Sequence, residues 1–267
     1  CDISGRVGLR DSEEKLMQNF FVETSAVQDG VIRLCGGDVN HMKNVLRMKP
    51  GETVRIQNGQ GVSYICRISG YEGQEAVLEI VEAEISDTEL PSEIYLFQGL
   101  PKGDKMEWIV QKAVELGAAG VIPFAAGRSV VRLDEKKAEK KANRWQAIAK
   151  SAAEQCGRAV IPEVSRPVSF AEALKQAAGL DVILIPYELE RGMKQTADII
   201  RGIRPGQSVG IFIGPEGGFD AAEIERAQES GARPVSLGSR ILRTETAGLT
   251  ALSILMYHLE SEGHNLK

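Results

Sequence analysis

The stretch Ile213-Gly214-Pro215-Glu216-Gly217-Gly218-Phe219 places three glycines within five residues, between an expected strand and an expected helix. The apolar run 209–212 before it is typical of a buried strand. Asp220 and Glu223 after it form a capping-box pattern that predicts a helix start. Because glycine lets a backbone come close to a ligand, the stretch predicts a ligand-binding loop in an α/β fold.

A second turn of this kind follows at Leu237-Gly238-Ser239-Arg240-Ile241-Leu242-Arg243-Thr244-Glu245-Thr246-Ala247. It lies between an expected strand over 234–237 and an expected helix over 247–259. Loops that leave the ends of neighbouring parallel strands form the crevice in which α/β sheets bind ligands. The glycines could also serve only as tight turns. In the binding interpretation, their exposed backbone groups and three apolar side chains form the crevice: Gly214, Gly217, Gly218, Gly238, Leu237, Ile241 and Leu242.

The rest of the chain predicts two domains. Residues 17–88 contain short apolar runs separated by turn signals such as Asn58-Gly59-Gln60-Gly61, a pattern typical of a small β-barrel, with one helical piece over 38–47 beginning at Asp38. The acidic segment 84–93 is the expected linker. From residue 94 onward, strands alternate with helices, which predicts a parallel sheet over 92–262.

Composition limits the classes of function. The chain has 267 residues, of which 43% are apolar and 26% charged, as in ordinary globular proteins. No apolar run approaches the roughly 20 residues of a membrane helix. The polar residues 1–16 do not resemble a secretory signal, so we expect a cytoplasmic protein whose first domain begins near Met17. The four cysteines lack a CxxC pair and the three histidines are scattered, so no metal site is predicted.

Nucleotide-binding motifs of other classes are absent from the sequence. No G-x-G-x-x-G follows the expected first strand of the second domain, and Gly99-Leu-Pro-Lys-Gly103-Asp104-Lys105 has the wrong spacing for a P-loop. Neither nicotinamide chemistry nor ATP hydrolysis is therefore supported. The net charge of −5 weighs against binding nucleic acid through bulk electrostatics, so any such function needs a local basic face.

Taken together, GPEGGF at 214–219 and LGSRILRTETA at 237–247 resemble the SPOUT-class RNA methyltransferases, specifically the bacterial 16S ribosomal RNA uridine N3-methyltransferase family. The similarity extends to five further motifs in the family's order, over roughly residues 17–260. These are His41-Met-Lys-Asn-Val-Leu-Arg47, Gln98-Gly-Leu-Pro-Lys-Gly-Asp-Lys105, Gln111-Lys-Ala-Val-Glu-Leu-Gly117, Pro123 with Arg128-Ser129, and Ala153-Glu-Gln-Cys-Gly-Arg158.

The resemblance implies a fold and an activity. The expected fold is a C-terminal SPOUT α/β domain with a parallel sheet and a trefoil knot, preceded by a PUA-like β-barrel that handles RNA. The expected reaction is methylation of N3 of a uridine in 16S ribosomal RNA by S-adenosylmethionine, without a metal, by a homodimer acting on the assembled small subunit. The open alternatives are a non-catalytic RNA-binding or ribosome-assembly protein and a SPOUT methylase with another RNA target.

The resemblance also assigns the site. The end of the strand carrying Leu184, Pro186 and Glu188 is expected to form the third side of the cofactor crevice. Glu216 could bind a cofactor group, bind a group of the partner chain, or only favour the positive end of the next helix. Three residues beside the reacting base are the catalytic candidates: Arg243, Glu245 and Thr246. For Glu245 and Thr246, helix capping is an alternative.

Arginine chemistry could replace a histidine base in this reaction. No histidine stands near the two loop motifs, and a cation near the uracil anion would lower the pKa of its N3 proton. Arg243, or an arginine of the partner subunit, could do this. Alternatively, Arg240 and Arg243 could grip phosphate or the target base. Many relatives carry a basic residue near the start of the first domain, where this chain has Gln18 and Asn19, so an N-terminal catalytic arginine is not expected here.

RNA contacts are expected from exposed cationic side chains in both domains. The candidates are His41, Lys43, Arg47, Lys102, Lys105, Lys112, Arg128 and Arg158. The last helix carries Leu249, Leu252, Leu255, Met256 and Leu259, which is more apolar surface than one helix face needs and predicts a dimer interface. Burial of that helix within its own domain is the alternative.

Overall fold

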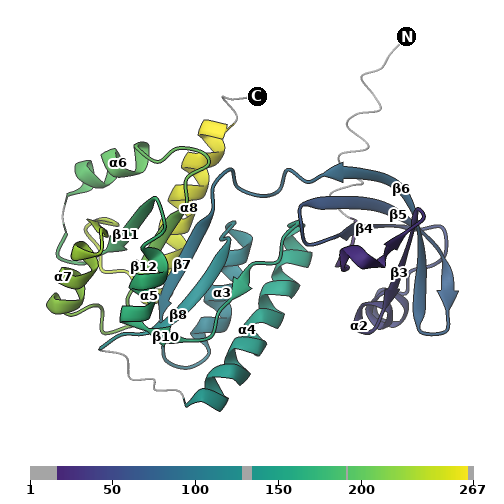
Figure 1. Ribbon diagram of the computed structural model, residues 1–267, viewed down its shortest axis with the longest axis horizontal. Coiled ribbons are helices and arrows are strands. Elements are labelled where there is room, and N and C mark those ends of the chain that lie inside the picture. The colour runs from purple at the N-terminus through teal and green to yellow at the C-terminus, as the bar shows by residue number, and fades with distance from the viewer. Residues whose placement is uncertain (1–16, 128–133, 191, 264–267) are drawn as a thin grey trace, which may run out of the picture. The chain divides into compact units, whose positions relative to one another are not determined.

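The computed structural model describes residues 17–127, 134–190 and 192–263, and the chain divides into two compact units (Figure 1). The first unit combines residues up to Glu89 with Ala153–Ile161, and the second combines Leu90–Ala152 with residues from Pro162 onward. The segment Ala153–Ile161 contains the end of the long helix α4 (Glu135–Cys156) and the residues after it. It belongs to the first unit, although it lies within the expected range of the second domain. None of the described helices is long and apolar enough to cross a membrane.

The first unit is a six-stranded sheet in the order β1-β4-β5-β6-β3-β2. The strands are β1 (Asn19–Phe21), β2 (Val27–Gln28), β3 (Val31–Cys35), β4 (Thr53–Gln57), β5 (Val62–Glu72) and β6 (Glu75–Ile85). β1 and β4 run parallel and the other neighbours antiparallel. Two register shifts between the long strands β5 and β6 bend the sheet around its core, as bulges do, so it curls into a half-barrel with β1 and β2 at its edges.

A short helical insertion follows β3. It consists of α2 (Gly37–Asn40) and a π-helical turn, η2 (His41–Val45), from which Met42 enters the core of the sheet. The helix begins at Gly37, one residue before the expected Asp38, and its N-cap position is Gly36, with φ 77° and no capping side chain. Asp38 lies one residue inside the helix, where its charge still favours the positive helix end.

The second unit is an all-parallel sheet in the order β10-β8-β7-β12-β11-β13, with β9 also paired to β8. The strands are β7 (Ile94–Gly99), β8 (Gly120–Ala125), β9 (Glu163–Val164), β10 (Val168–Ser169), β11 (Val182–Pro186), β12 (Val209–Ile213) and β13 (Arg233–Val235). The predicted α/β class is confirmed. β13 ends before the expected Leu237, because the backbone N–H of Ser236 bonds to Oγ1 of Thr196 at 2.9 Å and leaves the strand ladder.

Helices cover both faces of this sheet (Figure 1). They are α3 (Lys105–Glu115), α4 (Glu135–Cys156), α5 (Phe170–Ala177), α6 (Met193–Arg201), α7 (Ala221–Glu229) and α8 (Thr244–Gly263). α5 and α7 pack on the face that presents Phe97 and Phe212, whose rings stack 4.3 Å apart. α3 and α8 pack against one another, and α8 crosses the other face at Gly248 beside Leu96. The carboxyl ends of β7, β11 and β12 are thereby brought close to the start of α8.

Candidate ligand-binding site

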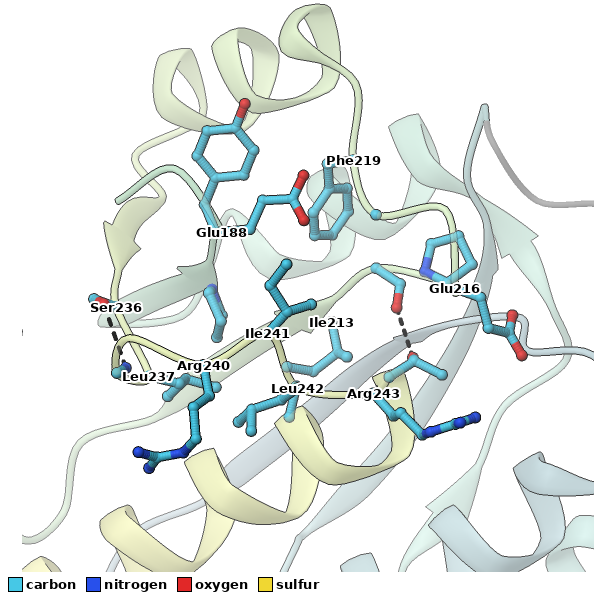
Figure 2. Close-up of a pocket in the computed structure, with 18 of the residues that line it drawn as sticks. Glu188, Ile213, Glu216, Phe219, Ser236, Leu237, Arg240, Ile241, Leu242 and Arg243 are labelled. Atoms are coloured by element: carbon cyan, nitrogen blue, oxygen red, sulfur yellow. Dashed lines mark hydrogen bonds between the residues drawn. The ribbon is translucent and has the colours of Figure 1, made fainter. Parts of the chain in front are cut away.

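A pocket of about 390 Å³ opens where β11 and β12 end and α8 begins (Figure 2). Its walls are the loop after β12, the loop after β13 and the end of β11, as the two glycine-rich stretches predict. Lys105, a predicted RNA contact, lines it, as do ten of the predicted cofactor-binding and catalytic residues: Pro186, Glu188, Gly214, Glu216, Gly218, Leu237, Gly238, Ile241, Leu242 and Arg243. The crevice predicted between the two loops is thus present in the structure.

Four predicted site residues lie outside the lining of this pocket. Leu184 is buried in β11, where its side chain packs inside the unit. Gly217 sits at the tip of the first loop and is exposed. Glu245 and Thr246 occupy the first turn of α8, behind Thr244, which does line the pocket. A direct contact between these four residues and a ligand in the pocket is therefore not supported by the geometry.

The pocket walls combine bare backbone with apolar side chains. Gly218 has φ 66° and Gly238 has φ 111°, and a Cβ at either position would meet no atom within 4 Å. Their backbone is therefore uncovered on the pocket side. Ile241 is 87% exposed and points between Glu188 and Ile213 in Figure 2. An exposed apolar side chain that lines a pocket can pack against an apolar or aromatic surface of a ligand.

A buried polar network lies beneath the first loop. The amide Nε2 of Gln98, at the end of β7, donates to Oγ1 of Thr244 at 2.9 Å, and Thr244 Oγ1 donates to the carbonyl of Gly214 at 2.6 Å. Gly99 faces the same loop, and a Cβ there would lie 2.7 Å from Pro215, so the loop packs directly on the strand end. The sequence analysis missed Gln98 and Thr244 as site residues, although a glutamine ending an apolar strand was a usable signal.

A charged cluster holds the outer side of the same loop. The ammonium of Lys105 lies 2.9 Å from Oε1 of Glu216 and 3.3 Å from Oε2 of Glu245. The backbone N–H of Lys102 also donates to Glu216, at 3.1 Å. Burial raises the pKa of Glu216, but the hydrogen bonds from Lys105 and from backbone N–H groups outweigh it, so this pKa lies below its ordinary value. The carboxylate is thus a loop anchor, and the bond to Glu216 in turn raises the pKa of Lys105.

The predicted RNA-contacting cations fall into three groups. In the first unit, His41, Lys43 and Arg47 are exposed along η2 and the residues after it, with the Lys43 ammonium 5.5 Å from the Tyr71 ring centre. In the second unit, Lys102 is exposed, whereas Lys105 is held by two carboxylates and Lys112 by Glu115 at 2.8 Å. Arg128 lies outside the described residues.

Arg158 has a structural position. Its side chain is only 5% exposed and forms an ion pair with Glu89, and the backbone N–H of Ala159 also donates to that carboxylate at 3.0 Å. A buried, paired arginine cannot meet a phosphate without leaving its carboxylate uncompensated. The ion pair joins the segment after α4 to the end of the first unit, and the expected contact of Arg158 with RNA would have to break it.

Known proteins share both units. Residues 88–256 match the family model of the RNA methyltransferase domain, and residues 34–81 match that of the RNA methyltransferase PUA domain. The Ribosomal RNA small subunit methyltransferase E of Bacillus subtilis is 40% identical over 91% of this chain and 98% of its own length. The enzyme of the same name from Neisseria gonorrhoeae, solved with S-adenosylmethionine, has a TM-score of 0.76 at 35% identity, covering 89% of this chain and 96% of that one.

A methyltransferase of Legionella pneumophila, also solved with this cofactor, has a TM-score of 0.80 at 33% identity over 90% of this chain and 97% of its own. A PUA-type sheet joined to a parallel α/β unit with a glycine-lined pocket defines the class as an RNA methyltransferase of the SPOUT type. Within that class, the chain belongs to the family of Ribosomal RNA small subunit methyltransferase E.

Proposed function

We propose that this protein transfers the methyl group of S-adenosylmethionine to N3 of a uridine in 16S ribosomal RNA. The observation that carries the proposal is the pocket between the loops 214–219 and 236–243, at the strand ends of a chain that belongs to this family. Related proteins of this fold from Legionella and Neisseria hold S-adenosylmethionine. No metal is invoked, because a sulfonium is already an electrophile.

The residues of the pocket fit this cofactor. Uncovered backbone at Gly218 and Gly238 can read the edge of an adenine ring, and Leu237, Ile241 and Leu242 can cover its faces. The carboxylate of Glu188 lies on the pocket side beside Phe219 in Figure 2, where it can accept hydrogen bonds from hydroxyl or ammonium groups. The cofactor supplies the methyl group; these side chains and backbone groups bind it, orient it and exclude water.

Arginine at the pocket edge is proposed to activate the base. Arg240 and Arg243 are exposed on the second loop, and in the described part of the chain neither guanidinium group forms a hydrogen bond or an ion pair with a protein group. Lys105, by contrast, is compensated by Glu216 and Glu245. The N3 nitrogen of uracil is a poor nucleophile while protonated, and a cation lowers the pKa of that proton by stabilising the anion. Arg243 is the proposed cation.

Replacing Arg243 with alanine tests that role. If chemistry limits the rate, single-turnover methylation should rise with pH to a plateau, and Arg243→Ala should slow it more at neutral pH than at high pH. The reason is that solution hydroxide can remove the proton when the cation is gone; each pKa unit corresponds to about 1.4 kcal/mol. Arg240→Ala, on the other side of Leu242 in Figure 2, is the control. A defect that is equal at every pH, or confined to RNA affinity, would assign Arg243 to phosphate binding.

RNA is proposed to bind to local groups of cationic side chains, because the chain as a whole has a net charge of −5. His41, Lys43 and Arg47 form one exposed group on the PUA-type unit, and Lys102, Arg240 and Arg243 form another around the pocket. Lys105 and Lys112 are weaker candidates, since carboxylates already pair with them. Arg128 remains a proposal from the motif. The proposed substrate is the assembled small subunit, whose folded RNA presents one uridine to the pocket.

The remaining family features are also proposals for this chain. They are the trefoil knot, domain limits of 17–88 and 92–262, a homodimer and a cytoplasmic location. Glu245 and Thr246 remain catalytic candidates only through contact with RNA, because they lie outside the pocket lining. Both lie in the first turn of α8, which begins at Thr244, and the charge of Glu245 there favours the positive end of the helix.

Mass spectrometry of ribosomal RNA nucleosides tests the function directly. Deleting the gene should remove 3-methyluridine from 16S RNA, and returning the gene should restore it. A variant with Ile241→Asp, which places a charge in the pocket, should fail to restore it while expressing as a folded protein. Unchanged 3-methyluridine on deletion would exclude this target, and loss of another methylated nucleoside would favour a SPOUT methylase with a different RNA substrate. Restoration by the Ile241→Asp variant would favour the non-catalytic alternative.

A further inference from the structure

We propose that Gln98 is a positioning residue for the cofactor loop, acting through Thr244 on the carbonyl of Gly214. The inference rests on the proposed function, because it concerns the loop that is proposed to bind S-adenosylmethionine. Gln98 does not line the pocket, and it is fully buried between the central strands, paired in register with Ile213 of β12 and Pro123 of β8. A fully buried amide at this place needs a physical reason, since burial of an unpaired polar group is costly.

The hydrogen bonds of Gln98 have a fixed direction. Its two amide hydrogens go to the carbonyl of Gly99 at 3.0 Å and to Oγ1 of Thr244 at 2.9 Å. The carbonyl of Gly99 can only accept, so it must face the amide nitrogen and not the amide oxygen. With that orientation set, Thr244 receives a hydrogen bond from Gln98. Its own hydroxyl hydrogen is then directed to the carbonyl of Gly214, 2.6 Å away.

This direction controls the backbone that faces the pocket. The carbonyl of Gly214 is the first acceptor after β12, and the amide of Gly218 bonds back to Pro215 at 2.9 Å to close the turn. Gly99 and Pro215 are in close contact beneath it. Fixing the Gly214 carbonyl against Thr244 therefore fixes the peptide planes from 214 to 218, whose exposed face lines the pocket.

An unpaired oxygen supports a directional role. Oε1 of Gln98 is buried and has no hydrogen-bond partner in the described structure. It faces Gly248 of α8, where a Cβ would lie 3.4 Å away. A glutamine placed only for packing could be replaced by an apolar residue that leaves no orphaned oxygen. The loop needs the amide N–H that donates to Thr244. The unpaired oxygen is present because an amide that supplies this N–H also carries an oxygen.

The substitution Gln98→Glu tests the direction of the bonds. Ionised glutamate has no donor, so the Thr244 hydroxyl must turn to donate to it and release the Gly214 carbonyl. Protonated glutamate again has a donor, and burial raises the pKa of a carboxyl at such a position. In calorimetry of the full-length protein, the variant should bind S-adenosylmethionine roughly tenfold more weakly than wild type at pH 8.5. Near pH 5.5, where the glutamate is protonated, the ratio of the wild-type affinity to the variant affinity should return toward one.

Three further variants separate positioning from packing. Thr244→Ser keeps the hydroxyl and should bind the cofactor as wild type does, whereas Thr244→Val removes it and should weaken binding roughly tenfold at every pH. Gln98→Met cannot capture the hydroxyl of Thr244, so it should bind more tightly than Gln98→Glu at pH 8.5. Affinity for ribosomal RNA should change less than cofactor affinity in all of them, because none of the substitutions removes a cation.

A flat affinity ratio for Gln98→Glu across pH, or normal binding by Thr244→Val, would overturn the proposal. A purely structural glutamine would lower the unfolding midpoint of the variants but leave the cofactor affinity of the folded protein unchanged. Failure of the proposed function gives a different result: wild type itself would not bind S-adenosylmethionine, or Ile241→Asp in the pocket would bind as well as wild type does.

Discussion

Gly218 has a backbone conformation that other residues rarely adopt, and it faces the pocket with nothing beside it. Gly218→Val should abolish S-adenosylmethionine binding, because a β-branched residue both strains the left-handed backbone and fills the space that the cofactor needs. Calorimetry measures the affinity, and circular dichroism checks the fold. Gly231→Val is the matched control: its φ of 90° carries the same strain, but it lies after α7 and outside the pocket lining. Equal loss of binding in both variants would point to misfolding.

Lys105 and Glu216 allow a prediction about pH. In wild type the pKa of Glu216 is lowered, so its contribution to stability is present above the unfolded-state pKa and is lost as pH falls through the lowered value. Lys105→Met removes the side-chain hydrogen bond and the charge that oppose burial, while the backbone N–H bonds remain, so the pKa of Glu216 should rise from its wild-type value. Carbon-detected NMR titration of the carboxyl measures this shift.

Lys102→Met is the control for that titration, because Lys102 contacts Glu216 through its backbone N–H, which the substitution keeps. The pKa of Glu216 in Lys102→Met should stay lowered.

The two variants also distinguish the functions of the two lysines. Lys105→Met should disturb the cofactor loop. Lys102→Met should weaken RNA binding and reduce the salt dependence of its affinity by about one phosphate contact. An unchanged pKa in Lys105→Met would contradict the anchor role of Lys105.

At the scale of elements, α8 has one group of buried apolar residues and another group that is exposed. Leu252, Leu255 and Leu259 are buried within its own unit, which is the alternative that the sequence left open. Ile254 and Tyr257, three residues apart, remain 39% and 75% exposed. Exposed apolar side chains on a helix that starts at the pocket are consistent with an interface beside the site.

The double variant Ile254→Asp/Tyr257→Asp should therefore shift the protein from dimer to monomer, because charges cannot be buried unpaired in an interface. Light scattering of the full-length protein measures its mass. Ile85→Asp, at an 88% exposed apolar position on β6 of the other unit, should leave the mass at that of a dimer. A wild-type monomer, or a double variant that remains dimeric, would place any interface elsewhere.

Local sequence patterns predicted some helix boundaries of the structure and missed others. Asp220 caps α7 as predicted, and Ser169 caps α5 in the same way, because a cap depends on residues only three positions apart. α6 was not predicted, although Met193, Ala197 and Ile200 recur at helical spacing; Thr196 is the one residue of this helix that the structure buries. α8 begins at Thr244, earlier than expected, because the first residues of the helix are polar and serve the network beneath the loop.

For the whole molecule, the sequence by itself determined what depends on neighbours along the chain. The order of strands and helices, the turn at Asn58, the two glycine loops and the family motifs are all local patterns, and they predicted the α/β class and the pocket walls. A net charge of −5 likewise limited RNA binding to local groups of cations.

Tertiary structure alone decided which distant residues meet. Gln98 reaches Thr244 across 146 positions, Lys105 reaches Glu216 across 111, and Arg158 reaches Glu89 across 69. These contacts pair two expected RNA-binding cations, Lys105 and Arg158, with carboxylates and anchor the loop. The physical reason is that local propensity specifies strands and helices, whereas the lateral order of the sheet sets which side chains share a space, and many orders are compatible with one local pattern.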